Sequence, residues 1–240
     1  MKALLFDFGG TIDTNGVHWS EEFWDAYQRA GIRISKADFE NAYISAEKRM
    51  SDTVVRPGDT LRTTLGKQIG LQFESLNHTR SLHDRATSPE LPARVAGDCY
   101  ERVRRTIDRL RPVLEACSRR FVLGLVSNFY GNLGAVCAEL RIDSLFKVII
   151  DSTEVGVRKP DPRIFQIAID KLAISTADTL VVGDSYDRDI VPAKGLGCMT
   201  IWLRGRSWTS PSDTSSADYV IYSLDAVGSF LSTARYAERP

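Results

Sequence analysis

Short runs of apolar, often β-branched residues recur along the chain, and stretches with helical spacing separate them. The runs are predominantly apolar rather than alternating, which is typical of strands that are covered on both faces in a parallel sheet. The predicted strands cover residues 3–8, 121–126, 146–150, 179–182, 199–203 and 219–222. Strands that alternate with helices in this way predict an α/β fold.

Residues 15–100 interrupt this alternation with a mostly helical pattern. Three aromatic side chains recur there at every fourth position, on one helix face: Trp19, Phe23 and Tyr27. Further helices are expected after Ser35, between Thr60 and Leu71, and from Ala93 toward Cys117. We therefore predict a helical insertion, residues 15–100, within a sheet domain that comprises residues 1–14 and 101–240.

Charge and cysteine usage narrow the function classes. Lys plus Arg and Asp plus Glu both number 31, so no overall field draws the chain to nucleic acid or to an anionic membrane. The first residues reach Asp7 too early for a signal peptide, and the 4 cysteines stand singly, as reduced thiols do. We expect a cytoplasmic protein, a monomer or homodimer, that binds neither nucleic acid nor membrane.

Polar residues follow the predicted strands at the point where each strand ends. Asp7 precedes two glycines and Thr11, and glycine lets backbone amides approach an anion closely. Ser127 and Asn128 follow the second strand and add small hydrogen-bond donors. Because open α/β sheets bind ligands at the carboxyl ends of their strands, these residues predict an anion site there.

Two later segments add charge to this picture. Lys159 precedes a proline that can open a helix, so its ammonium can project as a fixed counter-charge. The loop from Asp184 to Asp189 carries several carboxylates directly after an apolar strand. Carboxylates that are crowded together repel one another unless a cation compensates them, which predicts a magnesium site.

These four segments, in this order, resemble the four sequence motifs of the haloacid dehalogenase superfamily, in the branch with a helical cap after the first motif. The resemblance covers nearly the whole chain. It implies a doubly wound, Rossmann-like parallel sheet with an inserted α-helical cap. It also implies a Mg²⁺-dependent phosphatase that acts on a small phosphorylated metabolite.

The same resemblance implies a role for each motif residue. Asp7 would be the nucleophile that forms an aspartyl-phosphate, and Lys159 would offset the charge of the phosphoryl group. The phosphoryl oxygens would be held by Gly10, Thr11, Ser127, Asn128 and Lys159. Magnesium would be bound by Asp7, the Gly9 carbonyl and Asp184, with Asp189 steadying the loop or a bound water at the same metal site.

Gly9 departs from the family pattern. In the phosphatases of this superfamily the residue two after the nucleophile is a second aspartate, which protonates the leaving group and then deprotonates the hydrolytic water. Side chains alternate along a strand, so residues 7 and 9 face the same way, but a glycine supplies no proton relay. Acid–base help is typically worth about 10² to 10⁴ in rate, so slow turnover of ordinary phosphomonoesters is expected.

Several alternatives stay open at Gly9. A substrate with a good leaving group needs less acid catalysis, and Asp13, although close in sequence, is expected to cap a helix or hinge. Phosphonate hydrolases of the superfamily use a cap lysine instead, for which Lys36, Lys48 and Lys67 are candidates, although each fits a solvated helix position better. Dehalogenases also lack the second aspartate but need no magnesium. From a different class, a catalytically weak relative would bind a phosphorylated ligand or a protein partner.

Other aromatic and imidazole side chains are given ordinary roles. Packing is expected for Trp24, Tyr43 and Phe129, although they are candidates to line a pocket. Surface or capping positions are expected for His18, His78 and His83, which lack metal-ligand spacing.

Overall fold

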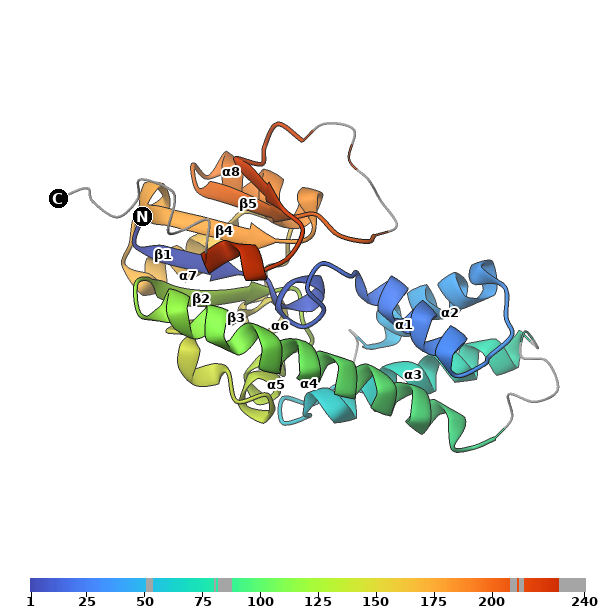
Figure 1. Cartoon of the computed structure of the whole chain (residues 1–240). Helices are drawn as coiled ribbons and strands as arrows, with labels where there is room; N and C mark the ends of the chain where they lie inside the picture. Colours follow the sequence, from blue (N-terminus) through green and yellow to red (C-terminus); the bar gives the residue numbers. More distant parts are fainter. Residues whose placement is uncertain (51–53, 80, 82–87, 208–210, 212–213, 229–240) are drawn as a thin grey trace.

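The computed structural model describes residues 1–50, 54–79, 81, 88–207, 211 and 214–228, and its centre is a 6-stranded parallel sheet with helices on both faces (Figure 1). The strands are β1 (Ala3–Phe6), β2 (Val122–Ser127), β3 (Val148–Asp151), β4 (Thr179–Gly183), β5 (Met199–Leu203) and β6 (Tyr219–Ile221). Their order is β3-β2-β1-β4-β5-β6, so the direction of winding reverses beside β1. The predicted doubly wound α/β sheet is confirmed, and its switch point lies next to Asp7.

The strand ends differ from the prediction by one or two residues. The first strand ends at Phe6, because residues Phe8–Ile12 fold into a helical turn, η1. Gly10 has φ +95° within that turn, a conformation that glycine adopts without the strain of a side chain. The turn brings the residues after Asp7 back over the end of the sheet.

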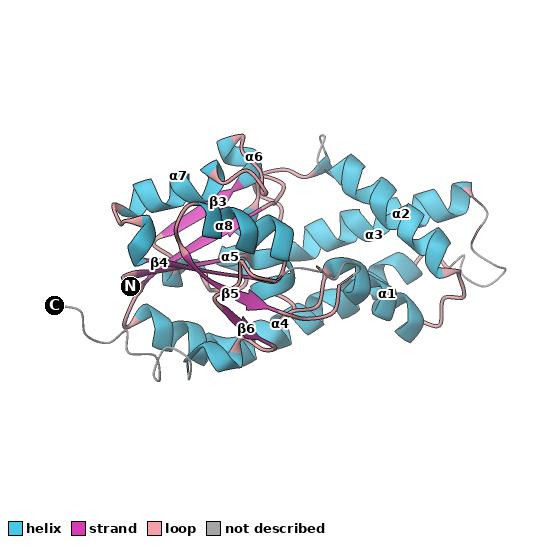
Figure 2. Cartoon of the chain, turned by 90° about the horizontal axis from the view of Figure 1, so that it is seen from above, coloured by secondary structure: helices cyan, strands magenta, loops and turns pink. Residues whose placement is uncertain are grey.

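Both faces of the sheet are apolar, which explains the predominantly apolar runs. One face packs on α4 (Leu91–Ser118) and α5 (Leu133–Glu139), and the other on α7 (Arg163–Leu172) and α8 (Val191–Gly195). Side chains alternate between the faces, since Leu4 and Phe6 belong to the first cluster and Leu5 to the second. Figure 2 shows the strands between α7 and α4.

The helical insertion consists of α1 (Trp19–Arg29), α2 (Lys36–Arg49), α3 (Leu61–His78) and the first part of α4. The helices expected in this segment are present. Ser35 and Thr60 cap the starts of α2 and α3, because their side-chain oxygens accept hydrogen bonds from the backbone N–H groups of Asp38 and Thr63. Helix α3 continues to His78, beyond its predicted end.

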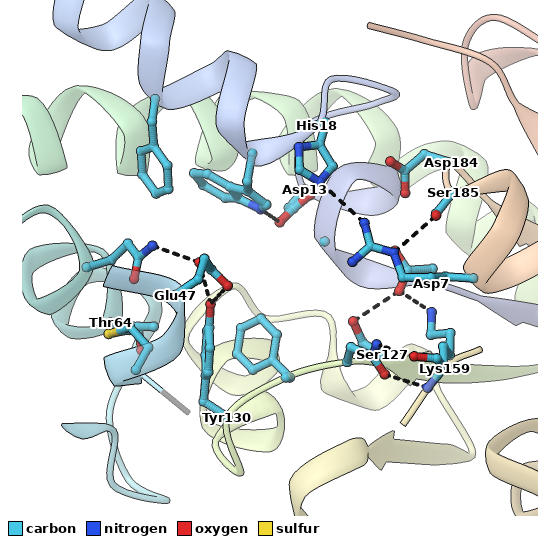
Figure 3. A pocket seen from close by; sticks show the side chains of 18 of the residues that line it. Asp7, Asp13, His18, Glu47, Thr64, Ser127, Tyr130, Lys159, Asp184 and Ser185 are labelled. Carbon is cyan, nitrogen blue, oxygen red and sulfur yellow. Dashed lines mark hydrogen bonds and ion pairs between the residues drawn. The ribbon is translucent and has the colours of Figure 1, made fainter. Parts of the chain in front are cut away.

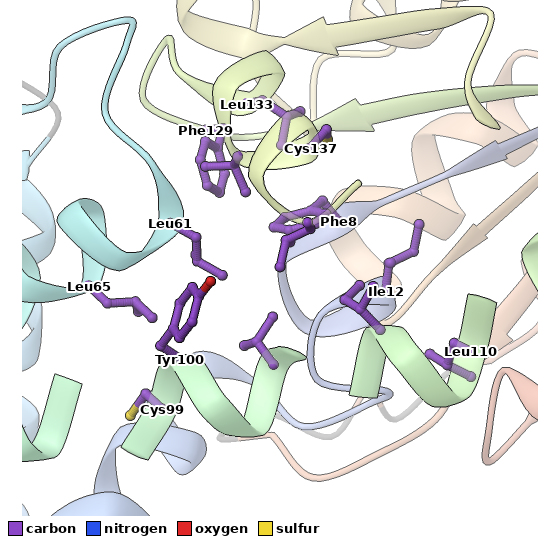
Figure 4. Close-up of a cluster of buried hydrophobic side chains, with 14 of the residues drawn as sticks. Phe8, Ile12, Leu61, Leu65, Cys99, Tyr100, Leu110, Phe129, Leu133 and Cys137 are labelled. Carbon is purple, nitrogen blue, oxygen red and sulfur yellow. The ribbon is translucent and has the colours of Figure 1, made fainter. Parts of the chain in front are cut away.

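Helix α4 links the helical insertion to the sheet. It runs without interruption from Leu91 to Ser118, across the predicted boundary between residues 100 and 101. Figure 4 shows one buried cluster that joins Leu61, Leu65 and Tyr100 of the insertion to Phe8 and Ile12 of the core. The division into residues 1–14 with 101–240 and 15–100 therefore stays a proposal. None of the helices in the described part of the chain has the length and apolar character to cross a membrane.

Candidate active site

Three polar side chains meet where β1, β2 and β4 end. Asp7 directly follows β1, Ser127 is the last residue of β2, and Asp184 directly follows β4. Because β1 pairs with both β2 and β4, their carboxyl ends are adjacent, and Figure 3 shows the three residues beside one cavity. The sequence placed these residues at one edge of the sheet, and the structure brings them together.

Lys159 joins two of the acidic groups. Its Nζ lies 2.5 Å from Asp7 Oδ1 and 2.6 Å from Asp189 Oδ1, and all three side chains are buried. Burial opposes the ammonium charge, but Asp189 and Asp7 together raise the pKa of Lys159 above its usual value. The lysine is therefore charged at neutral pH and compensates the carboxylate at the end of β1.

Asn128 fixes the backbone from which Lys159 projects. Its Nδ2 donates to the Lys159 carbonyl at 3.0 Å, and its Oδ1 accepts from the Lys159 N–H at 2.8 Å. The side chain also lines the cavity. The contacts in the structure thus give Asn128 a positioning function, and its predicted contact to a phosphoryl group stays a prediction.

A carboxylate cluster lies beside this lysine. One oxygen from each of Asp7, Asp184 and Asp189 can be chosen such that all lie within 4.8 Å of one another. Burial, followed by repulsion from Asp7 and Asp189, raises the pKa of Asp184 well above its usual value. Burial also raises the pKa of Asp189, although Lys159 opposes this. A divalent cation would relieve both effects, so the donor set fits a hard metal ion with oxygen ligands.

Glycines allow the carboxylates to come this close. A Cβ on Gly10 would stand 2.5 Å from Asp184 Oδ2, and a Cβ on Gly183 would stand 2.5 Å from the Asp189 side chain. Side chains at either position would push the acidic loop away from Asp7. The predicted metal contact of the Gly9 carbonyl stays a prediction.

Two hydroxyls complete the surroundings of Asp7. Ser127 Oγ donates to Asp7 Oδ1 at 3.0 Å, and Thr11 Oγ1 lies 3.2 Å from Asp7 Oδ2 and 3.0 Å from Asp184 Oδ1. Thr11 Oγ1 also accepts from the Asp184 N–H at 3.0 Å. These hydroxyls hold the Asp7 carboxylate in one orientation, and they lie where they can turn toward an incoming anion.

Gly9 is not required by packing. Its φ and ψ are −74° and 111°, which any residue can adopt. A Cβ added there would meet only the indole of Trp19, at 3.7 Å from Cδ1 and 3.8 Å from Nε1. These are ordinary van der Waals distances, so the structure has room for a side chain at the position where the family's phosphatases carry an aspartate.

Asp13 lies in the same cavity and is fully buried. Its Oδ1 accepts from the Gly10 N–H at 2.8 Å and its Oδ2 from the Trp19 indole N–H at 2.7 Å. Burial raises the pKa of Asp13 to about 7, while the hydrogen bonds from Gly10 and Trp19 oppose the rise and Asp7 adds to it. The expected capping of a turn is present, but Asp13 also faces the cavity.

The cavity lies between the sheet and the helical insertion and comprises about 850 Å³, part of it open to solvent. We call its two sides the core wall and the insertion wall. The core wall comprises Asp7, Ser127, Lys159, Asp184 and Asp189. The insertion wall comprises Phe23, Tyr43, Glu47, Met50, Leu61, Leu65 and Gln68.

One polar cluster interrupts the apolar insertion wall. The Glu47 carboxylate accepts hydrogen bonds from Tyr130 Oη at 2.9 and 3.0 Å and from Gln68 Nε2 at 2.7 Å. Burial raises the pKa of Glu47, and the Tyr130 hydrogen bond opposes this most strongly. The amide oxygen of Gln68 is buried and has no hydrogen-bond partner among the described residues. The cluster is rich in acceptors and suits a ligand that donates hydrogen bonds.

The sequence reasoning missed Glu47, Gln68 and Tyr130. A usable signal was present for Glu47, because it lies four residues after Tyr43 and three before Met50, so an acidic residue shares the apolar face of α2. Tyr43 and Phe129 line the cavity, whereas Trp24 packs on Phe39.

Among the described residues, the group of side chains that could hold a metal ion contains aspartates and no histidine. His18 caps α1 by accepting from the Ser20 N–H, as expected. It also lines the cavity, where burial and then Arg188 lower its pKa to about 4. His83 lies outside the described residues.

Comparisons with known proteins show the family of the chain and the fold that it shares with solved structures. Residues 1–197 match a family model for hydrolases described as haloacid dehalogenase-like. The chain is similar to the haloacid dehalogenase-like hydrolase domain-containing protein 3 of Danio rerio, with 24% identity over 94% of each chain. A glyceraldehyde 3-phosphate phosphatase of Methanocaldococcus jannaschii is 34% identical over 35% of this chain and 37% of its own. A solved 2-haloacid dehalogenase from Pseudomonas syringae pv. Tomato DC3000 has a similar fold, with a TM-score of 0.51 and 16% identity over 97% of this chain and 98% of its own.

Proposed function

We propose, from the premise that this chain belongs to the haloacid dehalogenase-like hydrolase family, that it is a Mg²⁺-dependent phosphatase. Its substrate is a small phosphorylated metabolite, and Asp7 carries the phosphoryl group between the two halves of the reaction. One observation carries this proposal: a buried carboxylate at the end of β1 is flanked by Lys159, by two hydroxyls and by two further carboxylates. The similarity to a glyceraldehyde 3-phosphate phosphatase supports a phosphoryl substrate.

A phosphorylated Asp7 divides the reaction into two displacements at phosphorus. An Asp7 oxygen attacks phosphorus while the bond to the leaving oxygen breaks, and the bonding electron pair departs with that oxygen. Water then attacks phosphorus, and the bond to Asp7 breaks, which releases phosphate and restores the carboxylate. Lys159, Ser127 and Thr11 lie where they can hold the phosphoryl oxygens throughout, so the group does not need to be repositioned between the steps.

A magnesium ion bound by Asp7, Asp184 and Asp189 would neutralise the phosphate charge that otherwise repels Asp7. The protein's own part is to place the three carboxylates together. Burial and the neighbouring carboxylates raise the pKa values of Asp184 and Asp189, and a bound cation would offset this repulsion.

The test is hydrolysis of an aryl phosphate and an acyl phosphate with and without magnesium. We expect turnover that requires the ion and that Asp7→Asn reduces by at least about 10³-fold, since the variant has no nucleophile. Asp170→Asn, which changes an exposed carboxylate on α7, is the matched control and keeps full activity. Binding of beryllium fluoride to wild type but not to Asp7→Asn would support the acyl-phosphate route independently of turnover. An active Asp7→Asn variant contradicts the proposal.

The alternatives have less support in the described residues. A phosphonate hydrolase needs a lysine facing the substrate, but Lys36 pairs with Glu21, Lys67 bonds to Asp59 and Val54, and Lys48 is exposed on α2. Among the described residues that line this cavity, none is one of these three lysines. The acidic cluster argues against dehalogenase chemistry, which needs no cation. A catalytically weak relative would bind a phosphorylated ligand without turnover. Turnover by wild type that is lost in Asp7→Asn would exclude this alternative.

We further propose that the enzyme works in the cytoplasm as a monomer or homodimer, without nucleic acid or membrane partners. The four cysteines support the location, because all are buried free thiols and none forms a disulfide.

A further inference from the structure

The missing carboxylate at Gly9 has a replacement in the fold. We propose that Asp13 is the general acid and base of the reaction and takes the place of the aspartate that the family's phosphatases carry two residues after the nucleophile. This inference rests on the proposed phosphatase function. It identifies the group that transfers protons at the substrate.

Gly9 and Asp13 share one neighbour. The Trp19 indole nitrogen lies 3.8 Å from the position of a Cβ on Gly9, and the same nitrogen donates to Asp13 Oδ2 at 2.7 Å. A carboxylate at position 9 would reach about 2.4 Å beyond its Cβ, from standard bond lengths and angles. The Asp13 carboxylate and a side chain at position 9 would therefore share the Trp19 indole as a neighbour. Figure 3 shows Asp13 and Asp7 in the same cavity.

The turn η1 brings Asp13 to this place. The Asp13 N–H donates to the Phe8 carbonyl at 3.3 Å, so the chain folds back and returns residue 13 to the end of the strand. The Gly10 N–H then holds Oδ1 at 2.8 Å. With both oxygens held by donors from different segments, the carboxyl group has one orientation, which proton transfer to a bound substrate requires.

The surroundings also suit a proton carrier. The Gly10 N–H donates to Oδ1 and the Trp19 indole N–H to Oδ2, and a carboxyl oxygen with two lone pairs can carry a proton as well. Burial, which raises the pKa to about 7, allows the group to release and regain a proton near neutral pH. An exposed aspartate would stay ionised there and could not serve as an acid.

The proton balance is complete with this one group. Protonated Asp13 gives its proton to the leaving oxygen as the phosphorus–oxygen bond breaks and the bond from Asp7 to phosphorus forms. Ionised Asp13 then takes a proton from water, whose oxygen bonds to phosphorus as the bond to Asp7 breaks. The products are an alcohol and phosphate, and Asp13 ends protonated as it began.

The first experiment is Asp13→Asn, assayed in matched pairs of alkyl and aryl phosphates with magnesium. The loss of kcat/KM for the alkyl phosphate is expected to be about 10² to 10⁴-fold, because its alkoxide leaves poorly without a proton. The aryl phosphate should lose less than about tenfold in kcat/KM, since a phenolate needs little help. Loss of the base should also make the phosphorylated enzyme accumulate, seen as a burst of aryl alcohol or as intact mass plus one phosphoryl group.

The second experiment restores the carboxylate at its usual place. Gly9→Asp combined with Asp13→Asn should recover at least about tenfold of the lost alkyl phosphatase activity, because position 9 has room and the same indole as a neighbour. Asp13→Ser serves as a second variant if Asp13→Asn fails to fold, since its hydroxyl can still accept from Gly10. Trp19→Phe removes the indole N–H together with part of the ring, and it reports how far activity depends on the hydrogen bond that orients Asp13 and on the packing of this ring.

A purely structural role for Asp13 gives a different result. Equal losses for alkyl and aryl substrates, with no burst and no recovery in the double variant, would overturn the inference. If wild type hydrolyses both phosphates through Asp7 and Asp13→Asn matches it, only the inference about Asp13 is wrong. If wild type hydrolyses neither phosphate, the proposed function itself is wrong.

Discussion

The core wall and the insertion wall of the cavity hold polar groups in different ways. On the core wall, Lys159 forms ion pairs with both Asp7 and Asp189, and the three carboxylates lie directly after β1 or in the loop and turn after β4. On the insertion wall, Glu47 accepts hydrogen bonds from the neutral side chains of Tyr130 and Gln68. If the proposed function holds, we expect the core wall to bind the phosphoryl group and the insertion wall to contact the rest of the substrate.

The largest expected effect on the core wall comes from replacing Lys159. Lys159→Met should lower the free energy of unfolding by about 3 to 5 kcal/mol in magnesium-free buffer, because two buried carboxylates lose their cation. Urea unfolding measures this, with the exposed Lys147→Met as a control that changes stability by less than about 0.5 kcal/mol. An equally stable Lys159→Met variant would mean that the core wall does not depend on a fixed charge network.

Asp13 gives the next largest effect, through pH. Its pKa is raised from 3.8 to about 7, so between these values the folded protein binds more protons than the unfolded chain, and stability falls as pH rises. The loss attributable to Asp13 is at most about 4 kcal/mol across that window. Unfolding curves of wild type and Asp13→Asn should therefore diverge in slope between about pH 4 and pH 7. A pH-independent difference between the two proteins contradicts the buried, protonated state.

Magnesium tests the acidic part of the core wall without an activity assay. The ion should raise the thermal unfolding midpoint of wild type, by the equivalent of about 2.7 kcal/mol at one hundred times its dissociation constant. Asp184→Asn should lose most of that gain, because one of the three oxygens is replaced by an amide. Asp187→Asn, an exposed carboxylate in the same loop, should keep it. Equal shifts in all three proteins would place the ion elsewhere.

The smallest expected effect is on substrate preference, and it concerns Glu47 and Gln68 on the insertion wall. Phosphate esters whose far end carries a hydroxyl or ammonium should be preferred over methyl-ended analogues, since Glu47 and Gln68 offer acceptors there. Glu47→Gln should reduce that preference by about tenfold in kcat/KM, close to 1.4 kcal/mol. Glu74→Gln, on the exposed side of α3, is the control. An unchanged preference would remove Glu47 from substrate selection.

The difference between the walls also explains what the sequence could predict. The apolar runs identify the strands, and a polar residue after a strand must lie at the carboxyl edge of the sheet, so Asp7, Ser127 and Asp184 were predicted to meet. Lys159 required the family motif, because no local pattern places a lysine after Gly156 in a particular cavity. The phosphate contact of Asn128 stays a prediction, and its two hydrogen bonds to the Lys159 backbone were not foreseen.

The remaining site residues depend on packing that local patterns do not encode. Asp13 was considered beside Gly9 but was expected to act as a cap, because its place in the cavity depends on the turn η1 folding back on the strand. Glu47 and Tyr130 come from α2 and from the segment after β2, and only the docking of the insertion on the sheet brings them together. The predicted boundary between residues 100 and 101 stays a proposal, since one helix runs through it.

The uninterrupted helix α4 has a mechanical consequence. At 1.5 Å per residue its 28 residues extend about 42 Å, with one end among the insertion helices and the other against the sheet. A tilt of about 5° at the sheet end displaces the opposite end by about 4 Å, more than the width of a water molecule. Leu110 and Leu114 are buried on this helix and do not line the cavity, so substitutions there should affect the cavity only through the position of the helix.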